Sequence, residues 1–131
     1  MSPLADFTYR DIHGIAGIRS AFPSLVRPLG MEAERVDDLV LMASELMANA
    51  LTHAATAEPR VRLVDGGGCV SVAVTDASVA APEVQHRDGN RVGGNGLRIV
   101  EALADHWGVH QHDGLGKSVW FSLKTGSSPL G

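Results

Sequence analysis

Apolar residues recur at helical spacing in three segments of the chain. The first runs from Ile12 to Leu29, where Pro23 and Pro28 are expected to kink or end the helix because proline has no amide hydrogen. The second is long and extends from about Glu32 to Ala55, and the third covers Asn95 to Asp105. These three segments are the predicted helices of the fold.

Shorter segments in which apolar and polar residues alternate predict strands. The clearest is Val70–Val74, which follows a glycine turn at Gly66–Gly68. The other predicted strands are Phe7–Arg10, Val61–Val64, Trp107–His112 and Ser118–Leu123, the last two joined by a turn at Gly114–Gly116. Strands that pair as hairpins, with helices to cover one face, indicate an α+β two-layer sandwich.

Composition and charge narrow the class of protein. With 131 residues, 44% apolar and 20% charged, the chain fits one soluble globular domain, which we expect over residues 1–124, followed by a disordered tail over residues 125–131. The net charge of -4 argues against a general nucleic-acid or membrane-surface binder. The apolar stretches are too short to span a bilayer, Met1–Leu4 has no secretory features, and the one cysteine, Cys69, suits a reducing cytoplasm.

The long helix carries an unusual polar stripe. Between Leu39 and Ala55 the only charged residue is Glu45, so it has no cation three or four residues away. Asn49 and His53 follow at intervals of four residues, on the same face. An amide oxygen suits Mg²⁺, and a carboxylate beside it can accept a proton from an attacking hydroxyl. The alternative is a buried polar pair that satisfies backbone or loop groups.

Two further candidate sites lie before and after a long loop. Asp76 ends a strand, where a carboxylate can accept a hydrogen bond from an exocyclic amine such as that of adenine; alternatively, Asp76 or Ser78 caps local backbone groups. Gly94 and Gly96 directly precede a helix, whose N-terminal N–H groups can bind phosphates, although a flexible loop is the alternative. The segment Ala77–Gly94 between them lacks periodicity, and long loops in compact domains are usually functional.

Together, these motifs resemble the N, G1 and G2 boxes of the GHKL ATPases, whose nucleotide site is the Bergerat fold. The sequence SELMANALTHA at residues 44–54 resembles the N box of the small bacterial anti-sigma-factor serine kinases and their regulatory paralogues. The sequences GNGLRIV at 94–100 and EALADHWG at 101–108 resemble their G2 box and following helix, and GKSVWF at 116–121 resembles their last strand. The resemblance covers about residues 31–124. It implies a mixed, mostly antiparallel sheet covered on one face by helices.

The resemblance also implies a role for each site residue. Asn49 would hold Mg²⁺ at the ATP phosphates, Glu45 would be the general base, and Asp76 would hydrogen-bond the adenine amino group. The residues implied in ATP binding are Asn49, Asp76, Ser78, Gly94, Gly96 and Leu97, and Ala77–Gly93 would be the lid. Many GHKL G1 boxes read Asp-x-Gly-x-Gly, whereas this chain has Ser78 at the first glycine position and no glycine after it.

The function implied is that of an ATP-binding, Mg²⁺-dependent regulatory kinase in the cytoplasm. It would phosphorylate a serine or threonine of an antagonist (anti-anti-sigma) protein, sequester a sigma factor and form a homodimer. The departure in the G1 box motivates an alternative, a non-catalytic nucleotide-gated protein-binding module.

Two other groups of residues have alternative interpretations. His106, His110 and His112 suggest a structural zinc site, but we expect His106 to end the preceding helix, away from the two strand histidines. Lys117 is within reach of a phosphate in principle, although we expect a solvated hairpin lysine.

Overall fold

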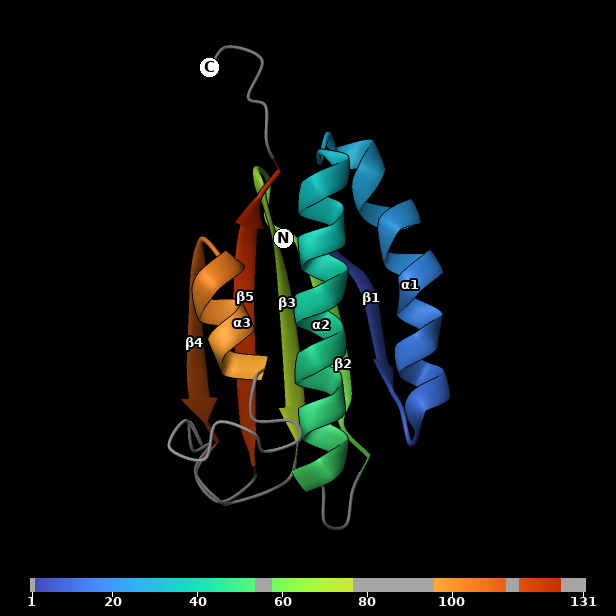
Figure 1. Ribbon diagram of the computed structural model, residues 1–131, viewed down its shortest axis with the longest axis vertical. Helices are drawn as coiled ribbons and strands as arrows, with labels where there is room; N and C mark the ends of the chain where they lie inside the picture. Colours follow the sequence, from blue (N-terminus) through green and yellow to red (C-terminus); the bar gives the residue numbers. More distant parts are fainter. Residues whose placement is uncertain (1, 54–57, 77–95, 113–115, 126–131) are drawn as a thin grey trace.

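Three α-helices lie side by side on one face of a five-stranded sheet (Figure 1). The computed structural model describes residues 2–53, 58–76, 96–112 and 116–125. The helices are α1 (Ile12–Val26), the short 3₁₀ helix η1 (Arg27–Leu29), α2 (Ala33–His53) and α3 (Gly96–Leu103). The strands are β1 (Ser2–Thr8), β2 (Arg60–Asp65), β3 (Cys69–Asp76), β4 (His106–Gln111) and β5 (Lys117–Lys124). The predicted α+β two-layer sandwich is confirmed.

The strand order of the sheet is β1-β2-β3-β5-β4. All four pairings among the described strands are antiparallel, so the sheet shows no parallel pair within these residues. After β3 the chain passes through α3 to the edge strand β4 and returns as β5 between β4 and β3. This connection places the end of β3 opposite the start of β5, where Asp76 pairs with Lys117 in the strand register.

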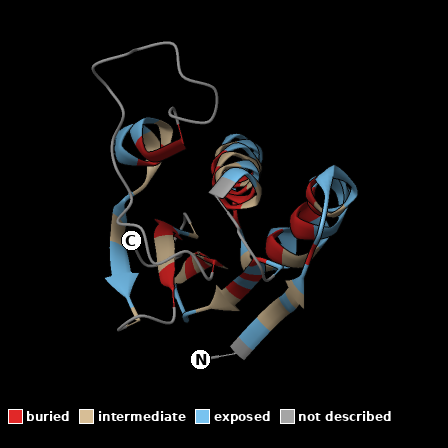
Figure 2. Cartoon of the chain, turned by 90° about the horizontal axis from the view of Figure 1, so that it is seen from below, coloured by how far each residue is buried: buried red, intermediate tan, exposed pale blue. Residues whose placement is uncertain are grey.

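The core lies between the helices and the sheet. Figure 2 shows the buried residues gathered on the helix sides that face the strands. The largest fully buried side chains include Phe22, Leu39, Met42, Met47, Leu63 and Phe121. Burying one such side chain contributes about 1.5–3 kcal/mol, so α2, which lies between α1 and α3 and buries one face, is the main anchor of the helical layer (Figure 1). No helix in the described ranges has the length and apolar character that crossing a bilayer requires.

Pro23, Pro28 and Gly30 shape the end of the first helical unit as predicted. Pro23 lies inside the last turns of α1, and Pro28 is the second residue of η1, in the first turn, where a missing N–H costs little. Gly30, in the left-handed region with φ of 89°, then closes the unit before α2. The chain therefore passes from α1 to α2 through the six residues 27–32.

Two predicted boundaries were wrong. The first strand begins at Ser2 and ends at Thr8, because its ladder with β2 extends over that whole length. His106 does not end a helix but begins β4, since the backbone N–H of Asp105 already donates to the Ser122 carbonyl and starts the ladder with β5. Within the predicted tail, the Thr125 N–H donates to the Gly68 carbonyl, and residues 126–131 lie outside the described residues.

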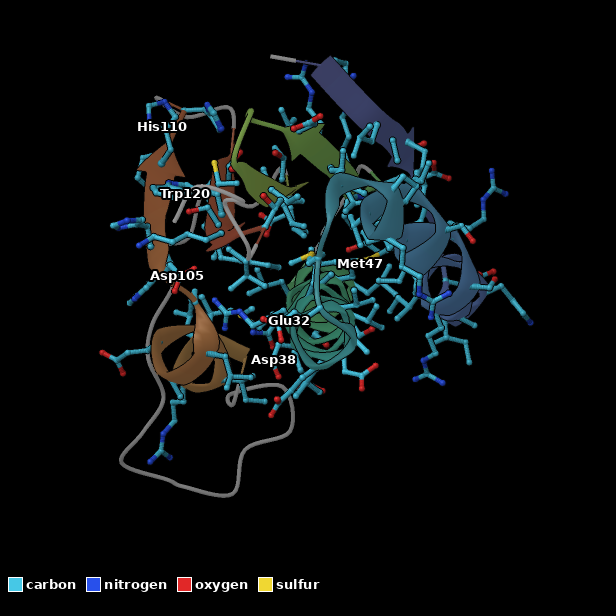
Figure 3. The ribbon with its side chains drawn as sticks, turned by 90° about the horizontal axis from the view of Figure 1, so that it is seen from above. Glu32, Asp38, Met47, Asp105, His110 and Trp120 are labelled. Atoms are coloured by element: carbon cyan, nitrogen blue, oxygen red, sulfur yellow. The ribbon has the colours of Figure 1, made fainter. Side chains whose placement is uncertain are left out.

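Asp105, which follows α3, connects α2 and the end of β5 through hydrogen bonds of its carboxylate. Its Oδ2 accepts hydrogen bonds from Arg35 Nη2 and from the backbone N–H of Lys124, each at 2.8 Å. Figure 3 shows Asp105 between α3 and β4. The hydrogen bond from Lys124 lowers the pKa of Asp105 most, and the Arg35 charge lowers it further against the opposing effect of burial. Arg35 also donates to the Leu103 carbonyl at the end of α3.

We expect Asp105→Asn to lower the free energy of unfolding at pH 7 by about 1–2 kcal/mol, because hydrogen bonds to a charged acceptor are lost or weakened. A carboxyl whose folded-state pKa is lowered stabilises the fold above its unfolded value of about 3.9, and this stabilisation is lost as the pH falls through the folded value. The difference in the free energy of unfolding between variant and wild type should therefore shrink below about pH 4. Urea unfolding from pH 7 down to pH 3 measures it, with the exposed Asp37→Asn as control. An equal loss at every pH would contradict this account.

Candidate functional site

The N-terminus of α3 packs directly against the polar stripe of α2. A Cβ added at Gly96 would lie 2.8 Å from Asn49 Nδ2 and 3.5 Å from the Glu45 carbonyl oxygen. A side chain at this position would force the Asn49 amide to move, so the glycine permits the two helices to approach. The structure thus brings together Asn49 and Gly96, two residues predicted to share a site.

The Asn49 side chain also carries an unsatisfied acceptor. Its Oδ1 is buried and has no hydrogen-bond partner among the described residues, and the same holds for Ser44 Oγ. A buried polar atom without a partner costs about 1–3 kcal/mol, which natural folds usually retain only for a reason. A neutral amide oxygen is a ligand that Mg²⁺ accepts, and this ion needs only one or two protein ligands when phosphates and waters complete its shell. Asn49 therefore fits the predicted metal–nucleotide contact.

Glu45 is half-buried on α2. Within the described part of the chain no ion pair is recorded for its carboxylate. Partial exposure removes much of the cost of the charge and leaves the oxygens accessible to an incoming group. The position suits a group that accepts a proton at the rim of the site.

Asp76 lies at the end of β3 on the face that the helices cover. It is buried, with an exposed fraction of 7%, and its Oδ2 and Oδ1 lie 3.3 and 3.4 Å from Lys117 Nζ. Lys117 is buried to a similar extent. The expectation that it would be a solvated hairpin lysine was therefore wrong. The sequence did contain a signal, because the period of two places Lys117 on the same face as Phe121 and Leu123. Burying both charges as a pair avoids the much larger cost of burying either alone.

Tyr9 is a neighbour of this site that the sequence pattern did not indicate. Its hydroxyl donates a 2.7 Å hydrogen bond to the Met47 carbonyl of α2. Burial raises the pKa of Tyr9 above its usual value, and the negative charge of Asp76 raises it further. The phenol therefore stays protonated and acts as a donor that ties the segment after β1 to α2.

The histidines form a separate polar group beside β4. The rings of His110 and His112 meet edge to face with centroids 4.7 Å apart, and His112 Nε2 lies 2.8 Å from Ser118 Oγ. Ser118 Oγ in turn lies 2.6 Å from Thr75 Oγ1. Across the described ranges, no three or more His, Cys, Asp or Glu side chains gather in a way that could hold a metal ion.

The remaining predicted residues divide between α3 and the region outside the described residues. Gly96 and Leu97 begin α3 and are buried. Their backbone N–H groups lie in the first turn of the helix, where no intrahelical acceptor is available, so they suit an anionic ligand. Ser78, Gly94 and the predicted lid Ala77–Gly93 lie outside the described residues.

Comparisons with known proteins show the family and the fold of the chain. A family model described as the histidine kinase-like ATPase domain matches residues 10–123. Two solved structures with the same fold are the blue-light activated histidine kinase of Erythrobacter litoralis EL346 and the histidine kinase domain of that protein. The first has a TM-score of 0.54 at 24% identity, over 76% of this chain and 33% of the other. The second has a TM-score of 0.53 at 22% identity, over 86% and 60%. No curated protein matches the sequence significantly.

Proposed function

Because the chain belongs to the histidine kinase-like ATPase domain family, one of the GHKL ATPases, we propose that it is an ATP-binding regulatory protein kinase of the anti-sigma-factor type. It would transfer the γ-phosphate of Mg-ATP to a serine or threonine of an antagonist protein and would also sequester a sigma factor. We further propose that it acts as a homodimer. The observation that carries the nucleotide part is the buried, unsatisfied Oδ1 of Asn49, a side chain that contacts the N-terminus of α3.

Each described site residue has a distinct task in this proposal. Asn49 would hold Mg²⁺, which neutralises phosphate charge when bound, and the first-turn N–H groups of α3 would bind phosphate oxygens. Asp76 would accept a hydrogen bond from the adenine amino group. The half-exposed Glu45 would accept the proton of the attacking hydroxyl.

Two measurements test this function in order. Calorimetric titration with ATP, with and without Mg²⁺, should show Mg²⁺-dependent binding. Incubation with γ-labelled ATP and a candidate antagonist protein should then move the label onto that protein. Absence of ATP binding would overturn the proposal, whereas binding without transfer to any cognate antagonist would overturn only the kinase part.

One sequence feature favours a second candidate, a nucleotide-gated binding module without catalysis. The segment that follows Asp76 reads Ala-Ser-Val-Ala and lacks the glycines that many GHKL members have there. A partner protein would then bind differently to the ATP-bound and the free chain, and no phosphate would move. Variants of Asn49 and Glu45 separate the two candidates.

A further inference from the structure

We propose that Lys117 is a positioning residue that sets the base specificity of the nucleotide site through Asp76. The inference rests on the proposed ATP binding and extends it to a residue outside the predicted site. Lys117 and Asp76 are 41 positions apart in sequence but face each other across the β3–β5 ladder, on the side that the helices cover.

Both residues of the pair are held in place by their strands and are buried. Asp76 and Lys117 are each about 7% exposed by side chain, and the ammonium lies within 3.4 Å of both carboxylate oxygens. Lysine is almost never so deeply buried unless it is paired. Since the backbone register fixes both Cα positions, the ammonium can hold the carboxylate in one orientation.

The chemistry of an ionised carboxylate explains why orientation matters here. Such a group only accepts hydrogen bonds. Adenine offers an amino donor at position 6, whereas guanine offers a carbonyl acceptor there. An oriented carboxylate therefore matches adenine and leaves two acceptors facing each other with guanine. The charge of Lys117 offsets the cost of keeping the carboxylate buried before the base arrives.

The Tyr9 hydroxyl does not replace Lys117 in holding the Asp76 carboxylate. The hydroxyl of Tyr9, which lies close enough to sense the Asp76 charge, already donates its hydrogen to the Met47 carbonyl. Lys117 is the cation for which a contact to Asp76 is described. Its removal should therefore take away the cation that holds the buried carboxylate.

The test compares ligands that differ only at position 6 of the purine. Calorimetry measures the affinities of wild type, Lys117→Met and Lys117→Arg for Mg²⁺ complexes of ATP, GTP and purine riboside triphosphate, which lacks the amino group. Lys117→Met should weaken ATP binding at least about tenfold but change purine riboside triphosphate binding less than about twofold, because only the amino contact depends on the oriented carboxylate. Lys117→Arg should restore most of the preference for ATP.

Matched controls make the result specific. Lys124→Met, an exposed lysine at the other end of β5, should leave all three affinities unchanged. An equal loss for every triphosphate would show a structural or phosphate-binding role and overturn the inference, as would unchanged ATP affinity. If Lys117→Met does not fold, Lys117→Gln provides the same comparison. If wild-type protein binds no ATP, the proposed function itself fails, which is a different outcome from a wild type that binds ATP and an unaffected variant.

Discussion

Replacing Asn49 by alanine is expected to abolish Mg²⁺-dependent ATP binding, with a loss of about 100-fold or more in affinity. That loss corresponds to about 2.8 kcal/mol at 1.4 kcal/mol per tenfold change. The physical reason is that Asn49 Oδ1 is a buried acceptor with no partner among the described residues, so a bound metal ion would satisfy it and alanine cannot. Calorimetric titration of both proteins with ATP, in Mg²⁺ and in EDTA, measures the effect.

The same substitution should not lower the free energy of unfolding of the ligand-free protein. It removes a buried polar atom whose hydrogen-bonding capacity is unused within the described residues, so the loss of packing is offset. Thr52→Ala is the matched control, since Thr52 lies on the exposed side of α2 and its hydroxyl donates only to the Ala48 carbonyl one turn earlier. Equal ATP affinity of Asn49→Ala and wild type would remove Asn49 from the site.

The second large effect is expected at Glu45. Replacing it by glutamine keeps the shape of the side chain but removes its ability to accept a proton. Phosphate transfer to the antagonist should fall by about 10²–10⁴-fold, the usual range for loss of a general base, while Mg-ATP affinity should stay within about twofold. Single-turnover transfer of labelled phosphate measures the rate, and calorimetry measures the affinity.

Paired measurements on the two variants decide between the candidate functions. If the chain is a kinase, Asn49→Ala should lose both ATP binding and phosphate transfer, whereas Glu45→Gln should lose phosphate transfer alone. In a non-catalytic binding module, Asn49→Ala loses nucleotide-dependent partner binding and Glu45→Gln keeps it. If both variants lost ATP binding equally, the division of roles between the two residues would be wrong.

Local patterns in the sequence were sufficient for the elements that carry the site. The helical periodicity of α2, the alternation in β3 and the glycine before α3 are properties of neighbouring residues, so they appear without knowledge of the fold. The spacing of four residues between Glu45 and Asn49 also placed both on one face of a helix. The motif order then predicted the fold and the family, which the family match confirms.

The electrostatic surroundings of the same residues depended on contacts between distant segments. Glu45 lies in an apolar stretch of the sequence, and the fold leaves its side chain half-buried. Lys117 looked solvated because it follows a hairpin turn, but the β3–β5 register places it in the core against Asp76. Nothing in the sequence around Tyr9 indicated that its hydroxyl would donate a hydrogen bond to the backbone of α2.

By itself, therefore, the sequence determined which helices and strands form and which residues each of them presents. Short-range periodicity, proline and glycine act within a few residues, and their effect is visible in the chain. Only the tertiary structure decided that Gly96 touches Asn49 and that Lys117 neutralises Asp76. These contacts join residues about 40 or more positions apart, and strand register and helix packing, which no local pattern encodes, bring them together.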